Sequence, residues 1–565
     1  MVETNGTRIP VAIVGGGPVG LMLALFLDLH GVRSVLFNTE KTTRWHPKGS
    51  TEGSRTMEHF RRLGISEEIR ALGLPPDHPT DVAYFTRFGG FELARLRMPS
   101  ANETRQNIAE APKTDQVPEP IHRANQMHLE RFLFDHAKTR PNITMRFGCY
   151  AESFEQNDDS VYISTVREPD GMAETWHAEY LVGCDGGRSL IRHLLGIKYQ
   201  GDTGIEQSYF GGRMFSTYVR VPALYQDFLG HRRAWQYWAV NPEIRSSMIA
   251  VNGRDEFLFR TRASEPNQPP EDAAVADAMR RCVGVDIAME IVAHEPWTAG
   301  MALVADRFAD RRVFLAGDAV HLFTPTGGFG MNTGIDDAAN LAWKLAAMVH
   351  GWGGSELMAS YEKERLPIAL RNTDAARKLT ANIGETDIDP AIEHDTSMGE
   401  AARRTAGEML ANFGEQFASI GVQLGARYDG SPLIASEGPA PADSFVTYTP
   451  TSVPGGRAPH LWLDEKRTFG SSLYDQLGTG FTLLRLGTHT ADVSEMLTAA
   501  ANLGIPLKVL DIDDMDARDL YQCDLALIRP DQHIAWRGNQ VANNPDRLFS
   551  QLTGFPAEVR IRACS

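Results

Sequence analysis

The sequence predicts an α/β fold in which a parallel-sheet domain is interrupted by an antiparallel β-sheet domain and followed by a smaller α/β module. Three observations indicate this arrangement. The chain opens with a strand, a glycine-rich turn and a helix; residues 207–259 are rich in β-branched and aromatic residues; and strand and helix signals alternate again near the C-terminus. With 565 residues, the chain is longer than a domain built around one hydrophobic core usually is, so two or three domains are expected.

The N-terminal turn has the spacing of a dinucleotide-binding site. Residues 9–14 are strand-like, residues 15–20 read Gly-Gly-Gly-Pro-Val-Gly, and residues 21–29 are apolar and helical. Gly15 permits the tight turn, Gly17 lets the backbone approach a pyrophosphate, and Gly20 lets the helix pack on the strand. The helix N-terminus faces the phosphates, so Pro18 and Val19 beside it are further candidate contacts, and a second strand completes a Rossmann-type unit.

The end of that second strand departs from the usual pattern. An acidic residue normally stands there and binds the ribose hydroxyls, whereas this chain has Asn38, with Glu40 two residues later. Either side chain can hydrogen-bond a ribose. Farther along, Arg123 and Gln126 stand at the start of an amphipathic helix, where a ligand can meet them.

Two later strands end in a glycine and an aspartate. One strand runs into Asp185-Gly186, and another runs into Gly317-Asp318. In open α/β sheets, ligands bind at the carboxyl ends of the strands, so both carboxylates are candidate ligand contacts. A glycine-rich loop follows, with Pro325, Gly328, Gly330, Met331 and Asn332, and it presents backbone N–H groups at the start of a long helix over residues 334–348.

These signals predict a discontinuous arrangement of domains. Residues 1–200 and 301–425 form the nucleotide-binding domain, and residues 201–300 form an antiparallel sheet that serves as a substrate platform. The polar stretch 101–120 is expected to be a functional insertion or a flexible loop. A linker rich in proline, serine and glycine covers residues 429–456, and residues 456–565 form the last module.

Composition argues against several classes of partner. The net charge of −16 disfavours nucleic acid and anionic membrane surfaces. No apolar run reaches the length of a membrane span, and the first six residues have no export signal, so a cytoplasmic location is expected. The five cysteines, at positions 149, 184, 282, 523 and 564, lack metal-ligand and CxxC spacing, which indicates buried free thiols and no metal site.

With the glycine turn, Asp185-Gly186 and Gly317-Asp318 in this order, the chain resembles the FAD-dependent aromatic hydroxylases. These are the single-component flavoprotein monooxygenases related to p-hydroxybenzoate hydroxylase. The resemblance spans nearly the whole length and is strongest to the longer phenol, chlorophenol, hydroxybiphenyl and polyketide hydroxylases, which append a thioredoxin-like domain. Here that domain has no CxxC, so packing or homo-oligomer contacts are expected of it.

The resemblance implies a role for each motif. Gly15, Gly17 and Gly20 would bind the FAD pyrophosphate, Gln126 and Arg123 the phosphate or ribityl region, and Asp318 the ribityl or ribose hydroxyls. Gly330, Met331 and Asn332 would offer backbone donors to the isoalloxazine edge. The Asp185-Gly186 element resembles one associated with FAD and nicotinamide nucleotide, and the Pro325 carbonyl would lie near the substrate.

The implied reaction is hydroxylation of a phenolic or polyketide ring with dioxygen and NADH or NADPH, through a flavin C4a-hydroperoxide. A base should deprotonate the phenol. Ser50 stands near the position of a histidine in hydroxybiphenyl-type enzymes, so the candidates here are His46, Tyr237 and Arg213, the last lowering the phenol pKa. Gln236 and Tyr237 are predicted to line the substrate pocket. A flavin dehydrogenase or oxidase without oxygen insertion, and a carrier resembling GDI, stay open as alternatives.

Overall fold

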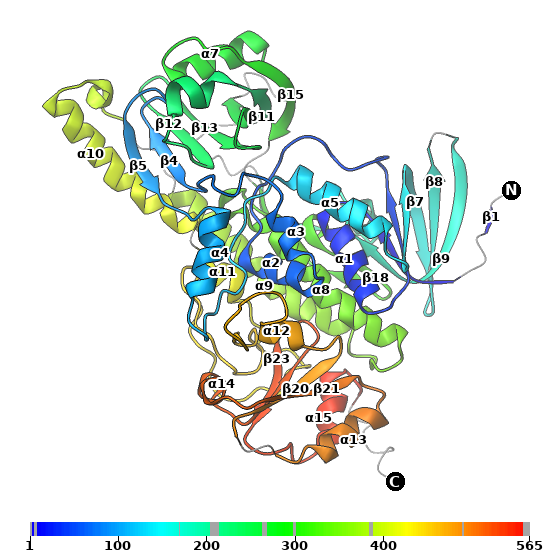
Figure 1. Cartoon of the computed structure of the whole chain (residues 1–565). Helices are drawn as coiled ribbons and strands as arrows, with labels where there is room; N and C mark the ends of the chain where they lie inside the picture. Colours follow the sequence, from blue (N-terminus) through cyan, green and yellow to red (C-terminus); the bar gives the residue numbers. More distant parts are fainter. Residues whose placement is uncertain are drawn as a thin grey trace.

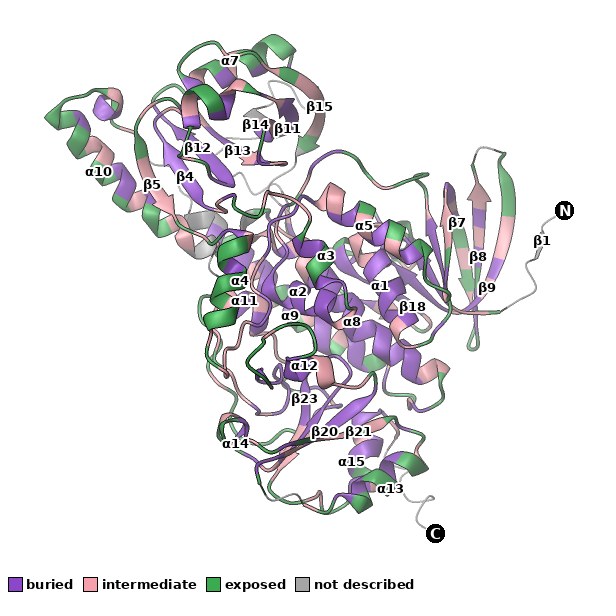
Figure 2. Ribbon diagram, in the orientation of Figure 1, coloured by how far each residue is buried: buried purple, intermediate pink, exposed green. Residues whose placement is uncertain are grey.

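The computed structural model describes residues 3–4, 8–168, 170–203, 214–262, 268–297, 301–382, 388–417, 419–488 and 491–556. Figure 1 shows a central body with an antiparallel sheet on one side and a small module, coloured orange to red, on the other. In Figure 2 the central helices and strands are mostly buried, whereas exposed residues gather on the outer helices. The predicted α/β class is confirmed.

The central body is built on a mixed sheet in the order β17-β18-β9-β2-β3-β6. The pairs from β18 to β6 are parallel, as a Rossmann-type unit requires. Its strands are β2 (Ile9–Val14), β3 (Ser34–Asn38), β6 (Ile143–Phe147), β7 (Cys149–Gln156), β8 (Val161–Arg167), β9 (Met172–Gly183), β17 (Ala309–Asp310) and β18 (Val313–Leu315), with β1 (Glu3–Thr4) beside β9. A separate small sheet joins β10 (Tyr199–Thr203), β16 (Met301–Ala305) and β19 (His321–Leu322).

Helix α1 follows the glycine turn and packs against the long helix α8. The helices of the central body are α1 (Pro18–Leu29), α2 (Ser54–Arg62), α3 (Ser66–Arg70), α5 (Gln126–Lys138), α6 (Leu190–Leu194), α8 (Phe329–Val349), α9 (Ala359–Asn382) and α11 (Ile420–Leu424). Helix α8 begins five residues before the expected start at residue 334, directly after the glycine-rich loop. None of the described helices is both long and apolar enough to cross a bilayer.

The antiparallel sheet has the order β15-β11-β14-β13-β12-β4-β5. Its strands are β4 (Val82–Phe85), β5 (Glu92–Leu96), β11 (Met214–Arg220), β12 (Gln236–Val240), β13 (Arg245–Ala250), β14 (Glu256–Arg262) and β15 (Glu290–Trp297). Strands β4 and β5 come from outside residues 201–300, and β4 pairs with β12 in parallel. Helix α7 (Asp272–Val283) covers the outer face of the sheet, and helix α10 (Ser397–Ala411) packs beside β5.

The C-terminal module contains a sheet in the order β21-β20-β22-β23. Its elements are β20 (Phe481–Leu486), β21 (Leu507–Ile512), β22 (Leu525–Ile528), β23 (Ile534–Gly538), α12 (Leu473–Gln476), α13 (Ser494–Asn502), α14 (Met515–Tyr521) and α15 (Pro545–Leu552). Strand β20 is parallel to β21 and antiparallel to β22. The expected thioredoxin-like α/β module is therefore confirmed.

The stretch 101–120 is not simply a loop. Ser100 caps helix α4 (Ala101–Glu110) through a capping box with Glu103, and this fixes the start of the helix. The segment that follows docks on the C-terminal module, where the Gln116 amide donates to the His460 carbonyl at 2.9 Å. The alternative of a flexible loop is therefore wrong, and Ser100 and Glu103 are the helix-start signal that could have indicated the helix. The other alternative, a functional insertion, stays a prediction.

A buried charge network joins the C-terminal module to α8 and α9. The Arg529 guanidinium donates to both Glu364 carboxylate oxygens at 2.7 and 2.9 Å, and it also pairs with Asp531. Asp531 in turn accepts from the Trp343 indole of α8 at 3.2 Å. Lys344, also on α8, pairs with Glu364 at 2.6 Å. Desolvation alone would raise the pKa of Glu364. The positive charges of Arg529 and Lys344 have the larger effect and hold that pKa below its usual range.

We expect Arg529→Gln to destabilise the protein by about 3–5 kcal/mol, because it leaves buried carboxylates without their main counter-charge. The measurement is equilibrium unfolding in urea, followed by tryptophan fluorescence. The matched control is Arg485→Gln, which breaks the exposed Arg485–Asp511 pair of the same module and should cost no more than about 1 kcal/mol. Equal losses in the two variants would contradict the importance given to the buried network.

Candidate active site

A cavity of about 1370 Å³ lies where the central body meets the antiparallel sheet. Its wall runs without interruption from the glycine turn through the strand ends Asp185 and Asp318 to the inner face of the sheet. Single-ligand pockets usually have 300–1,000 Å³. The volume is therefore sufficient for two ligands that lie next to each other.

The glycine turn has the geometry that its sequence predicts. Gly15 has φ +113°, and a Cβ there would lie 2.2 Å from the Cys184 carbonyl oxygen. A Cβ at Gly20 would lie 1.9 Å from the Gly15 oxygen, so only glycine lets the helix pack this closely. At Gly17 an added Cβ would meet nothing within 4 Å. The backbone at Gly17, Pro18 and Val19 therefore faces open cavity, as a pyrophosphate at a helix N-terminus needs.

Asn38 holds the turn in place. Its Oδ1 accepts from the Gly16 N–H at 2.9 Å, and its Nδ2 donates to the Glu40 carbonyl at 3.2 Å. Both Asn38 and Glu40 line the cavity. The amide at this position thus has a structural role, and the Glu40 carboxylate stays beside the space where a ribose would lie.

The two strand-end aspartates both face the cavity. Asp185 Oδ2 accepts from the Ile191 N–H at 3.1 Å, whereas Oδ1 is buried without a hydrogen-bond partner. Desolvation raises the pKa of Asp185 and of Asp318. Carboxylates at strand ends in a cavity wall can accept hydrogen bonds from ligand hydroxyls, so both residues fit the ribose or ribityl part of a flavin nucleotide.

Gly317 lies behind the cavity wall and is held by buried charges. Its N–H donates to Asp337 Oδ2 at 3.1 Å, and His321 Nε2 lies 2.7 Å from the same oxygen. Arg365 Nε donates to the other Asp337 oxygen at 2.7 Å. Because Asp318 follows Gly317 directly, this cluster fixes where the Asp318 carboxylate stands.

At the start of α8, Gly328, Gly330 and Met331 line the cavity, but Asn332 does not. The Asn332 amide donates to the carbonyls of Thr51 and Gly328 at 2.9 and 2.7 Å, and its oxygen accepts from the Gly53 N–H at 2.8 Å. Asn332 thus holds the loop. Pro325 and Gly186 also line the cavity.

Arg123 and Gln126 both reach the cavity, at different places. The Arg123 guanidinium stacks on the Trp235 ring at 3.9 Å and donates to the Thr51 hydroxyl. Burial lowers its pKa to about 10. Arg123 therefore lies at the junction with the antiparallel sheet, next to an aromatic wall. The Gln126 amide donates to Glu130 at 2.6 Å.

His46, one of the predicted candidate bases, lines the cavity. Its Nδ1 lies 2.9 Å from the Pro47 carbonyl, which fixes the neutral tautomer with the hydrogen on Nδ1. Nε2 is buried and has no hydrogen-bond partner. Desolvation lowers the pKa of His46, partly offset by Glu295, whose Oε2 lies 3.8 Å from Nδ1. The cations of Lys48 and Arg260 act against Glu295 and lower the pKa of His46 further, so burial and these two charges favour the neutral ring.

The prediction that Tyr237 lies in the pocket is wrong, and so is its catalytic role. Consecutive strand residues point to opposite faces, and here Gln236 and Trp238 line the cavity. The Tyr237 side chain is fully buried on the other face, where its hydroxyl donates to Tyr225 and accepts from the Ala234 N–H. Arg213, the other predicted electrostatic aid, lies outside the described residues.

The sequence interpretation missed several charged or polar cavity residues on the antiparallel sheet, three of which lie on neighbouring strands. Ser216, Arg260 and Glu295 come from β11, β14 and β15, and all three line the cavity. Cross-strand pairing brings them together: Ser216 is opposite Arg260 on one side and Glu295 on the other. Strand alternation could have indicated their face, but only the register shows that they share one row.

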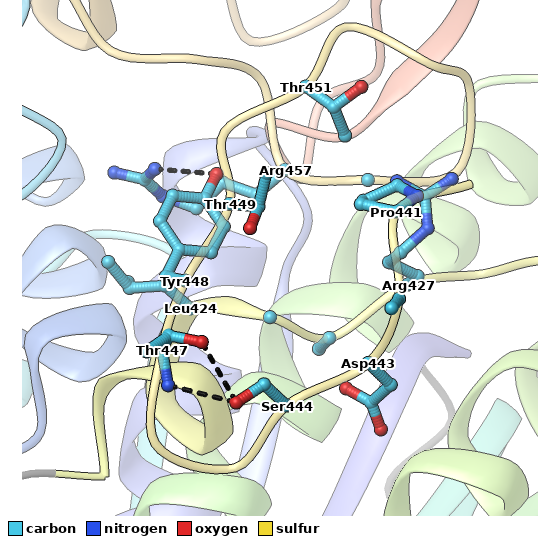
Figure 3. Close-up of a pocket in the computed structure, with 14 residues that line it drawn as sticks. Leu424, Arg427, Pro441, Asp443, Ser444, Thr447, Tyr448, Thr449, Thr451 and Arg457 are labelled. Carbon is cyan, nitrogen blue, oxygen red and sulfur yellow. Dashed lines mark hydrogen bonds between the residues drawn. The ribbon is translucent and has the colours of Figure 1, made fainter. Parts of the chain in front are cut away.

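A second cavity, drawn in Figure 3, lies within the linker region. It holds only about 30 Å³, room for a water molecule or two. Around it the Thr447 N–H and hydroxyl both donate to the Ser444 hydroxyl, and Arg457 donates to the Tyr448 hydroxyl at 3.2 Å. These contacts pack the linker, and the space is too small for an organic substrate.

Comparisons with known proteins agree with this geometry. The family model of an FAD binding domain matches residues 8–376, and that of the aromatic-ring hydroxylase C-terminal domain matches residues 451–555. The tetracenomycin B2 monooxygenase-dioxygenase of Streptomyces olivaceus is 31% identical, over 98% of this chain and 99% of its own. Phenol 2-monooxygenase of Pseudomonas sp. (strain EST1001) is 28% identical, over 99% and 95%.

A solved structure of the rebeccamycin biosynthetic enzyme RebC with reduced flavin superposes with a TM-score of 0.86. It is 33% identical and covers 98% of this chain and 100% of its own. The chain therefore belongs to the FAD-dependent aromatic hydroxylases, the single-component flavoprotein monooxygenases of the p-hydroxybenzoate hydroxylase superfamily, and is itself an FAD-dependent aromatic monooxygenase.

Proposed function

We propose that this monooxygenase takes its electrons from NADH or NADPH and hydroxylates a phenolic ring of a multi-ring aromatic substrate. The continuous cavity of about 1370 Å³ carries the proposal, because it joins the nucleotide-binding turn to an aromatic wall of the antiparallel sheet. Trp235, Trp238, Ile249 and Phe417 give that wall its apolar surface. A small phenol would leave much of this surface uncovered, whereas a multi-ring molecule would fill it.

In this proposal the chain holds FAD along one side of the cavity. Gly15, Gly17 and the N-terminus of α1 take the pyrophosphate, and Glu40, Asp185 and Asp318 take ribose and ribityl hydroxyls. The backbone at Gly330 and Met331 faces the isoalloxazine. When bound, FAD accepts a hydride equivalent from the nicotinamide nucleotide and supplies the oxygen-activating chemistry.

The protein residues on the other side position the substrate. Gln236 offers an amide next to Trp235 and Trp238, and Pro325 belongs to the lining of the same cavity. The imidazole of His46, whose residue lines the cavity, serves as the base for the phenol, and Glu295 stabilises the imidazolium that forms.

The proposal is tested by NADH and NADPH consumption in air with a panel of one-ring, two-ring and three-ring phenols. We expect multi-ring phenols to accelerate consumption most and to gain one oxygen atom, measured by product mass. If a one-ring phenol is the best substrate, or if every phenol yields only hydrogen peroxide, the proposed substrate class is wrong.

We expect Asp318→Ala to weaken FAD binding about tenfold or more, because the cofactor loses a hydrogen bond to a charged group. The measurement is the flavin released from the holoenzyme during dilution and ultrafiltration. Asp202→Ala is the control, since Asp202 is exposed and forms a long pair with Arg377 at 3.5 Å. Unchanged flavin retention in Asp318→Ala would remove this carboxylate from the FAD site.

We expect His46→Gln to lower kcat about 100-fold or more at neutral pH, because the phenol loses its base. Desolvation lowers the pKa of His46 below its ordinary value of 6.5, so wild-type activity should be level above that value and fall as the ring becomes protonated at lower pH. In His46→Gln the rate should instead rise with pH, following ionisation of the phenol itself. A control, His136→Gln on α5, should keep the wild-type profile; the same profile in His46→Gln would refute the base assignment.

A further inference from the structure

One row of side chains crosses the cavity face of the antiparallel sheet from an aromatic end to a charged end. Trp238 on β12 is opposite Ser247 on β13, and on the far side of β13 Arg260 of β14 is opposite Ser216 of β11. Trp238, Ser247, Arg260 and Ser216 all line the cavity. The wall therefore has one apolar end and one cationic end.

The cationic end is built by two residues 44 positions apart in the sequence. The Arg260 guanidinium donates to the Ser216 hydroxyl oxygen, which leaves the hydroxyl hydrogen of Ser216 able to donate to a ligand. Ser216 is buried, and burial lowers the pKa of Arg260 to about 9. A buried guanidinium forms its strongest hydrogen bonds with an anionic ligand group, either one that offers two oxygens or one that has a single ionised oxygen.

Glu295 completes the row but does not occupy the cationic end. It is opposite Ser216 on β15, and its carboxylate is directed to His46, 3.8 Å away. Burial lowers the pKa of Lys48 on the neighbouring loop, and the Glu295 charge partly offsets that shift. The Glu295 charge is thus shared with His46 and Lys48.

We propose that Arg260 and Ser216 bind an anionic oxygen group, a carboxylate or an ionised phenol, at one end of the multi-ring substrate. Two strand spacings separate β14 from β12, about 10 Å. A molecule that reaches from Arg260 to Trp238 therefore has about two or three fused rings between its anionic group and its apolar end. This inference rests on the proposed function and adds the acidic substituent that the substrate should carry.

The experiment measures ligand binding to the FAD-loaded enzyme without turnover, from the change in flavin absorbance. The probes are anthracene-2-carboxylate, its neutral carboxamide, and 2,4-dinitro-1-naphthol as an ionised phenol. We expect the carboxylate or the ionised naphthol to bind at least about tenfold more tightly than the carboxamide. Comparison of the carboxylate with the naphthol shows which anionic oxygen group the site prefers.

Arg260→Gln should abolish the preference for the anionic probe, Arg260→Lys should keep part of it, and Ser216→Ala should reduce it severalfold. Arg220→Gln is the matched control, because Arg220 lies on the same strand as Ser216 but outside the cavity and pairs with Glu256 and Glu290. Equal binding of anionic and neutral probes to the wild type, or a full preference in Arg260→Gln with normal flavin content, would overturn the inference. The proposed function fails separately, if no multi-ring phenol is hydroxylated.

Discussion

The active site depends on how helix α8 is held. This helix starts at the cavity, with Gly330 and Met331 in the wall, and its 21 residues extend about 30 Å toward the C-terminal module. One of its faces carries Asp336, Asp337, Asn340 and Lys344, all buried. Buried charges are tolerable only when opposite charges and hydrogen bonds meet them, so the cations around α8 determine its position.

Those cations come from different parts of the chain. Arg365 on α9 pairs with Asp336 and Asp337 near the cavity, and Arg529 of the C-terminal module pairs with Glu364, the partner of Lys344. Arg55 on α2 donates to the Asp531 carbonyl. The sequence of the C-terminal module has no CxxC motif. Its buried contacts have a structural role, because they complete the charge balance of the helix that starts at the cavity.

Much of this architecture could be predicted from the sequence, because its signals are local. The glycine turn, the two strand-end aspartates and the strands of the C-terminal module depend on spacing over a few residues. The rest depends on pairing between distant segments. Strands β4 and β5 join a sheet whose other strands lie more than 100 residues later, and Ser216 meets Arg260 only through cross-strand register.

Tyr237 was misplaced for a related reason, since Gln236 and Tyr237 are strand neighbours and cannot both face one cavity. Asn332 follows Gly330 and Met331 in sequence but lies outside the cavity wall, and its side-chain amide bonds Thr51, Gly53 and Gly328.

The central claim is that a single cavity brings reduced flavin, dioxygen and a multi-ring phenol together for oxygen insertion. Its most direct test is turnover of the holoenzyme with a three-ring phenol and NADPH or NADH under ¹⁸O₂, followed by mass spectrometry of the product. The account predicts a product that carries one ¹⁸O atom, with nucleotide consumption matched to product formation. Nucleotide oxidation that yields labelled hydrogen peroxide and no labelled product, across phenols that bind the flavin-loaded enzyme, would contradict it.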